Sequence, residues 1–76
     1  MKYLRNEKAL KKLGERIKHL RVSQNTSQSQ LAFEAGIPLN QVGRIERGEI
    51  NVGVSTLFAI AKALDLEIKE FFNFEM

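Results

Sequence analysis

Apolar residues recur at intervals of three and four along the first part of the chain, which places them on one face of a helix. The residues of this stripe are Leu10, Leu13, Ile17 and Leu20. The spacing predicts one amphipathic helix over residues 3–23, followed by Asn25, a residue type that tolerates a left-handed backbone. Gly14 lies inside the stripe and costs about 1 kcal/mol relative to Ala in a helix, so we expect close packing against another helix there.

Two short helices are predicted next, over residues 27–35 and 38–47. Ser27 can cap the first helix, and Gly36 can adopt the positive φ that ends it. Pro38 can start the second helix, because an amide at that position would be unpaired anyway. The apolar positions that should face inward are Leu31, Ala32, Ala35, Val42 and Ile45. Helices this short need support from the rest of the chain, and their layout is that of a helix-turn-helix, whose second helix lies in a DNA groove.

The remainder of the chain predicts a loop at residues 49–53, a helix at 54–64 and a short last helix or turn after Asp65. The stripe of the long helix consists of Val54, Leu57, Ile60, Ala61 and Leu64, and the last segment carries Ile68, Phe71 and Phe72. The fold class predicted is all-α: a compact five-helix domain that spans residues 1–76, with residues 1–6 as a candidate flexible arm.

The composition restricts the classes of function. The chain has 76 residues, no Cys and one His, His19, so a thiolate metal site, a two-His metal site and a His-centred nucleophile are excluded within one chain. No phosphate loop is present, and no apolar run approaches the roughly 18 residues of a membrane span. We therefore expect no enzyme, no cofactor, no metal, no small-molecule substrate and no membrane partner. The basic N-terminus lacks the apolar core of a signal peptide, which favours the cytoplasm.

The charges are distributed unevenly. Residues 1–25 hold eight Lys and Arg against two Glu, a local charge of +6, whereas residues 49–76 hold five acids against two Lys, a local charge of −3. A basic front and an acidic back suit a protein that faces a polyanion from one side, although an ordinary solvated helix face gives the same pattern.

Several short motifs, in this order and with these gaps, resemble the phage repressor and Cro-like (XRE) helix-turn-helix family, over roughly residues 10–66. They are Ile17-Lys18-His19-Leu20-Arg21, Ser27-Gln28, Leu31-Ala32, Gly36-Ile37, Val42, Arg44-Ile45-Glu46-Arg47-Gly48, Thr56-Leu57, Ile60-Ala61 and Ala63-Leu64. The resemblance implies a five-helix, lambda-repressor-like DNA-binding domain that acts as a homodimer on a palindromic operator.

The resemblance also implies roles for single residues. Gln28 falls where the family has a Gln that binds a DNA phosphate and braces the recognition helix. Arg21 and Glu46 fall on a partly buried salt bridge that joins the first helix to the end of the recognition helix. The residues that would face base edges are Leu39, Asn40, Gly43 and Arg44. Three departures from the family pattern are Pro38, Gly43 and Gly53, the first two of which make an operator code copied from relatives unsafe.

The chemistry of the recognition helix agrees with these roles. Asn40 and Gln41 can each pair bidentately with adenine, Arg44 can pair with guanine, and Leu39 can meet a thymine methyl group. Gln41 is equally suited to bracing or to a solvated surface. Gly43 either lets the helix sit deeper in the groove or merely avoids a clash.

Phosphate contacts are expected from Gln28, from Arg47 and from the amides of Gly53, Val54 and Ser55 at a helix N-terminus. Lys2 and Arg5 form either a minor-groove arm or a frayed tail.

Three aromatic residues near the C-terminus, Phe71, Phe72 and Phe74, are difficult to hide in one small core. We predict that they contribute to a dimer interface with part of the fourth helix, the alternative being that they cap the core of the monomer.

Together these observations predict a DNA-binding transcriptional regulator whose partners are double-stranded DNA and a second copy of the chain. It would repress by blocking polymerase; activation through a surface such as Glu34 is the variant on this mechanism. Two other classes remain. An antitoxin-like or scaffold module would use Phe33, Phe58 or the C-terminal aromatics on a protein partner. A membrane-surface role for the first helix would take its apolar stripe away from the core.

Overall fold

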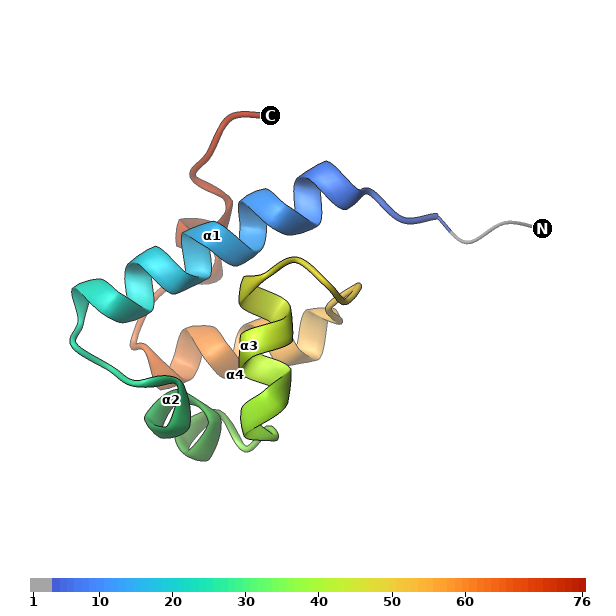
Figure 1. The fold of residues 1–76 in the computed structure, drawn as a ribbon. Coiled ribbons are helices and arrows are strands. Elements are labelled where there is room, and N and C mark those ends of the chain that lie inside the picture. Colours follow the sequence, from blue (N-terminus) through green and yellow to red (C-terminus); the bar gives the residue numbers. More distant parts are fainter. Residues whose placement is uncertain (1–3) are drawn as a thin grey trace.

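The computed structural model describes residues 4–76, which form four α-helices and one 3₁₀ segment. The helices are α1 (Glu7–Ser23), α2 (Gln28–Ala35), α3 (Leu39–Glu46) and α4 (Val54–Ala63), and the 3₁₀ segment is η1 (Ile68–Phe72). Figure 1 shows α1 lying across α3, with α2 beside α3 and α4 behind it. The all-α class is confirmed.

The predicted count of five helices is slightly off, because the last element is the 3₁₀ segment η1 rather than an α-helix. Asp65 takes a left-handed φ of 55°, which ends α4, and the Leu66 amide then donates to the Ala61 carbonyl at 2.9 Å. Asp is among the few residues besides Gly that tolerate this conformation. The chain that follows packs against α1 and forms the short 3₁₀ segment η1 of five residues.

The helix ends follow the predicted caps, with small shifts. The Asn6 side chain accepts from the Ala9 amide at 2.9 Å, so α1 begins at Glu7 rather than at residue 3, and Tyr3 lies outside the described residues. Ser27 Oγ accepts from the Gln30 amide at 3.0 Å and caps α2. The predicted positive φ values occur at Asn25 (55°) and at Gly36 (72°).

The start of α3 differs slightly from the prediction. Pro38 is the N-cap, with an extended φ and ψ of −61° and 144°, and the helix itself begins one residue later at Leu39. The fixed φ of Pro suits either position.

One hydrophobic core joins all five elements. Its buried members are Leu13, Ile17, Leu31, Ala32, Val42, Ile45, Leu57, Ile60, Ala61, Leu64 and Phe71. The stripes predicted from helical spacing therefore supply the core from α1, α2, α3 and α4, except at Val54, which is 67% exposed and was wrongly predicted to face inward. None of the helices in residues 4–76 is long and apolar enough to cross a bilayer.

The burial of Phe71 contradicts its predicted place in a dimer interface. Its side chain is 0% exposed and is one of the largest fully buried groups of the monomer. Arg16 of α1 holds the segment in place, because its Nε donates to the Glu70 carbonyl at 2.8 Å. A phenyl ring that stabilises the monomer core by about 2–3 kcal/mol cannot also face a partner, so the prediction is wrong for Phe71. Phe72 is half exposed, and its ring centroid lies 6.4 Å from that of Phe74.

Gly14 lies at a close approach between α1 and the end of α3, as its place in the stripe suggested. A Cβ at this position would lie 2.3 Å from the Ile45 carbonyl oxygen and 2.6 Å from the Glu46 carbonyl oxygen. Backbone atoms cannot move aside as a side chain can. The missing side chain therefore sets the distance between the two helices.

We predict that Gly14→Ala lowers the free energy of unfolding by about 2–3 kcal/mol, although Ala is favoured over Gly within a helix by about 1 kcal/mol. Urea denaturation followed by circular dichroism would measure the change. Gly53→Ser is the matched control, because nothing lies within 4 Å of its added Cβ and Ser can cap α4. The control should leave the stability unchanged or raise it by a few tenths of a kcal/mol. A neutral Gly14→Ala would contradict the close approach.

Candidate nucleic-acid interface

The outer face of α3 carries the side chains expected to read bases. Val42 and Ile45 are 1% and 2% exposed and anchor the helix in the core. Asn40 and Arg44 are exposed, and Leu39 is 51% exposed. Gln41 is half-buried. The helix therefore turns its amide and guanidinium groups to solvent while its apolar side faces the core.

Gly43 does not lie open on this face. The residue is buried, and a Cβ on it would meet Arg47 Nη1 at 3.0 Å and Gln28 Nε2 at 3.8 Å. In this conformation the Arg47 guanidinium lies over Gly43, so the predicted contact of Gly43 with a base would require that side chain to move. The sequence left two explanations for Gly43, a deeper position of the helix in the groove or the avoidance of a clash. The structure favours the second, since the missing side chain leaves room for the Arg47 guanidinium.

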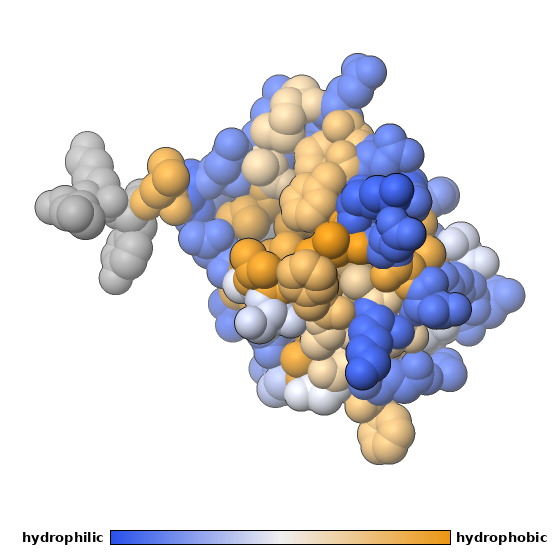
Figure 2. Space-filling model, turned by 180° about the vertical axis from the view of Figure 1, so that it is seen from behind, coloured by the Kyte–Doolittle hydropathy of each residue, from blue (hydrophilic) through white to orange (hydrophobic). Residues whose placement is uncertain are grey.

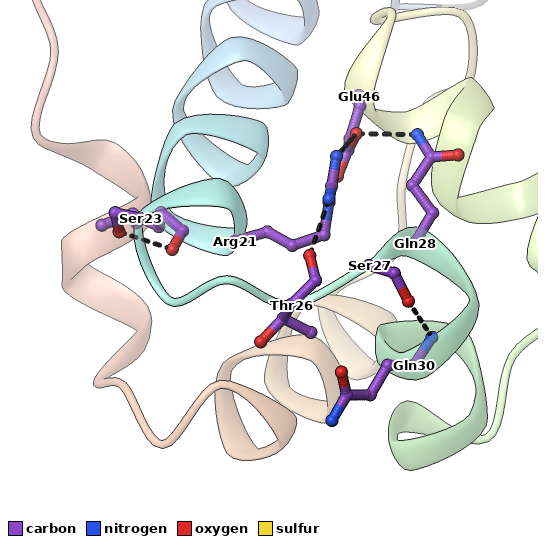
Figure 3. Close-up of polar contacts among 8 residues, drawn as sticks. Arg21, Ser23, Thr26, Ser27, Gln28, Gln30 and Glu46 are labelled. Atoms are coloured by element: carbon purple, nitrogen blue, oxygen red, sulfur yellow. Dashed lines mark hydrogen bonds and ion pairs between the residues drawn. The ribbon is translucent and has the colours of Figure 1, made fainter.

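A buried carboxylate at the end of α3 ties that helix to two others (Figure 3). Glu46 accepts from Arg21 Nε at 2.7 Å and from Arg21 Nη2 at 3.0 Å, the bidentate geometry that a guanidinium and a carboxylate favour. Gln28 Nε2 donates to the same carboxylate at 2.9 Å. The structure thus contains the ion pair between Arg21 and Glu46, and Gln28 braces it from the start of α2.

Arg21 makes one more hydrogen bond besides the two to Glu46. Arg21 Nη1 donates to the Thr26 carbonyl at 2.8 Å, which holds the connection between α1 and α2 (Figure 3). Arg21 and Glu46 are 7% and 5% exposed, so their charges are largely removed from water. Within the described residues no buried side-chain nitrogen or oxygen lacks a hydrogen-bond partner. The cost of desolvation is therefore offset by a complete set of bonds.

A second acidic residue, Glu49, lies among the exposed arginines and was missed by sequence reasoning. Arg47 Nε donates to its carboxylate at 2.7 Å. This hydrogen bond lowers the pKa of the Glu49 carboxyl below its usual value; partial desolvation opposes the shift, and the charges of Arg47, Arg44 and Lys11 reinforce it. The same bond raises the pKa of the Arg47 guanidinium. The only signal in the sequence was the spacing of two residues between Arg47 and Glu49.

Two more candidate groups lie near this loop, the start of α4 and the side chain of Arg5. Gly53 is the N-cap of α4, with no side-chain cap, and Val54 and Ser55 are exposed at the first turn. Arg5 Nη2 donates to the Glu49 carbonyl at 2.8 Å, so this arginine is attached to the loop; Lys2 lies outside the described residues. Figure 1 shows the segment before α1, the loop after α3 and the start of α4 on the same side of the molecule.

A different face carries the exposed apolar side chains. Figure 2 shows a band of apolar surface across the face that lies behind α3 in Figure 1, where α4 is nearest to the viewer. The exposed large apolar residues of α4 and of the C-terminal segment are Val54, Phe58, Phe72 and Met76. Phe33 on α2 is 87% exposed.

The sequence and the fold match known proteins. Residues 17–71 match the Helix-turn-helix family. The control protein C.BamHI of Bacillus amyloliquefaciens is 36% identical over 62 residues, which cover 80% of this chain and 76% of that protein. The control protein C.SmaI of Serratia marcescens is 41% identical over 56 residues, which cover 74% of this chain and 67% of that protein.

A solved structure agrees. The restriction-modification controller protein C.AhdI of Aeromonas hydrophila superposes with a TM-score of 0.82 at 41% identity, over 83% of this chain and 96% of that one. The fold, an outward-facing α3 and these likenesses define a DNA-binding transcriptional regulator. The chain belongs to the XRE-type helix-turn-helix family.

We predict that Arg21→Met lowers the free energy of unfolding by about 3–5 kcal/mol, because it leaves the Glu46 carboxylate buried without its counter-charge. The double variant Arg21→Met/Glu46→Leu should be more stable than the single variant, since it leaves no buried charge. Urea denaturation of the double variant and of both single variants, Arg21→Met and Glu46→Leu, would measure this. A double variant whose loss equals the sum of the two single losses would contradict the prediction.

Proposed function

We propose that the protein is a controller-type transcriptional repressor that binds as a homodimer to a two-fold symmetric operator. One observation carries the proposal: α3 presents Asn40 and Arg44 to solvent while the buried bonds of Glu46 hold the helix from behind. Occupancy of an operator that overlaps a promoter would block polymerase. The likeness to the control proteins supports the controller class.

The two reading side chains would act by direct hydrogen bonding in the major groove. Asn40 can accept and donate to one adenine, and Arg44 can donate two hydrogen bonds to one guanine. Leu39, half exposed beside them, can contact a thymine methyl group. Gln41 is half-buried on the flank of this face, which suits support of the neighbouring side chains at least as well as a contact to a base.

Backbone phosphates would be held around this reading face. Gln28 Nε2 has a second hydrogen besides the one that it gives to Glu46, so it can brace α3 and donate to a phosphate together. Arg47 and the uncapped amides of Gly53, Val54 and Ser55 are suited to the next phosphates along the groove. Such contacts fix the register on DNA and make the affinity fall steeply with salt.

We propose that the apolar face of α4 and the C-terminal segment binds a second copy of the chain. A patch of this kind on a small protein commonly marks an interface. Phe72 and Phe74 keep the role predicted from the sequence, and Phe58 of α4 joins them. Two-fold pairing would place two copies of α3 about 34 Å apart, one turn of DNA.

Arg44→Ala should weaken binding to the preferred duplex by about 1–3 kcal/mol and relax the choice of base at one position in each half-site. Selection of bound sites from random duplex DNA, with wild type and variant, measures both effects. Arg47→Ala is the matched control; it should weaken all sequences similarly and leave the selected motif intact. An unchanged motif with Arg44→Ala would remove Arg44 from base reading.

The double variant Phe58→Gln/Phe72→Gln should weaken dimerisation at least about a hundredfold, because symmetry removes each ring twice from the interface. Sedimentation equilibrium measures the dissociation constant. Phe33→Gln, which changes an exposed ring on α2, is the control and should leave the dimer intact. Dimers that persist in the double variant would place the interface on another face.

A further inference from the structure

The basic side of the molecule contains one acidic side chain that the proposed DNA contacts do not use. Glu49 lies in the loop after α3, and its carboxylate accepts from Arg47 Nε at 2.7 Å and from Arg47 Nη2 at 3.4 Å. Arg44 Nε lies 3.8 Å from the same carboxylate. The two arginines that this end of α3 offers to DNA are therefore both turned towards one carboxylate.

Cations from other parts of the chain meet at the same loop. Arg5, before α1, donates to the Glu49 carbonyl at 2.8 Å. The backbone of α1 touches the loop directly, since a Cβ on Gly48 would lie 2.7 Å from Lys11 Cα. The Glu49 carboxylate therefore lies near positive charge from Lys11 of α1 and from the end of α3, whereas Arg5 holds the backbone of the loop and pairs with Glu7.

The geometry fits a phosphate as well as it fits a carboxylate. A guanidinium binds either group through two parallel hydrogen bonds, and lysine binds phosphate as a point charge. A phosphate could replace the Glu49 carboxylate at little cost. The side chains of Arg47 and Glu49 are 61% and 47% exposed, and ion pairs at such positions contribute little to stability. Glu46, three residues earlier, is buried and cannot exchange in this way.

We infer that Arg47 binds a backbone phosphate of DNA at the position that the Glu49 carboxylate occupies in the free protein, with the charges of Arg44 and Lys11 nearby. A phosphate displaces the carboxylate when DNA binds. The displaced carboxylate stays close to the DNA, because the loop remains attached to α1, and its charge opposes that of the phosphates. Glu49 therefore lowers the affinity for every sequence. This inference rests on the proposed contacts of α3 with DNA.

The test is the salt dependence of DNA binding by the full chain, measured by fluorescence anisotropy. The probes are one duplex of selected sequence and one of scrambled sequence. Glu49→Gln should bind both duplexes about three- to tenfold more tightly at low salt. The slope of log K against log salt concentration should become steeper by about one, because one more net positive charge faces the DNA. Glu49→Lys should steepen the slope by about two.

The control is Glu34→Gln, which raises the net charge by the same amount. Glu34 lines a hollow between α2 and α4 together with Ala59 and Lys62, away from the loop after α3. The Glu34→Gln variant should have a DNA affinity and a salt-dependence slope close to those of the wild type. Thermal melting of each variant would verify that these exposed substitutions leave the fold intact.

The outcomes separate the inference from the function on which it rests. An unchanged or weakened affinity in Glu49→Gln, with an unchanged slope, would overturn the inference and leave Glu49 as a structural partner of Arg47. An equal gain in Glu34→Gln would also overturn it, since total charge would then be the cause. If the wild type and all variants failed to bind either duplex, DNA binding itself would be rejected.

Discussion

Three N–H groups converge on the two carboxylate oxygens of Glu46, two from Arg21 of α1 and one from Gln28 of α2. Each short helix of the helix-turn-helix is thereby attached to the long α1 through one buried charge. Removal of either charge would strand the other where water cannot solvate it, a far larger penalty than the net value of the intact pair. The orientation of α3 is thus held by an ion pair in which the loss of one partner is strongly unfavourable.

Two glutamates three residues apart perform opposite tasks because their surroundings differ. Glu46 is 5% exposed and all its partners are internal, so it holds α3 rigidly. Glu49 is exposed on the loop, where water and salt screen its attraction to Arg47 and a phosphate can replace it. Burial, rather than residue type, decides which carboxylate belongs to the scaffold and which takes part in an equilibrium with DNA.

Much of the fold could be predicted because its determinants are local. Helical spacing identified the four stripes, and caps such as Ser27 and Gly36 placed the helix ends to within a few residues. Gly14 predicted a close helix–helix contact, because a glycine weakens a helix unless the lack of a side chain is needed for packing. The Arg21–Glu46 pair, in contrast, came from the family resemblance, since nothing in the spacing of residues 25 positions apart indicates a contact.

The differences from the predictions concern positions whose environment is set by distant parts of the chain. Phe71 and Phe72 are adjacent and alike, and only the 3₁₀ turn of η1 decides which ring enters the core. Gly43 lies on the predicted outer face, yet the side chains of Arg47 and Gln28 fold over it. The environment of Glu49 was not predicted because Lys11, whose charge acts on its carboxylate, and Arg5, which binds its carbonyl, are about 40 residues away in sequence.

The shortness of α3 links the stability of the core to the reading of DNA. Eight residues that include Gly43 do not form a stable helix on their own. Its shape depends on Val42 and Ile45 in the core, on the close approach at Gly14 and on the bonds of Glu46. The base contacts proposed for Asn40 and Arg44 require that shape to be rigid, because bidentate hydrogen bonds tolerate little displacement. A loosened core would therefore reduce discrimination between sequences first, while phosphate contacts from flexible side chains would continue to provide affinity.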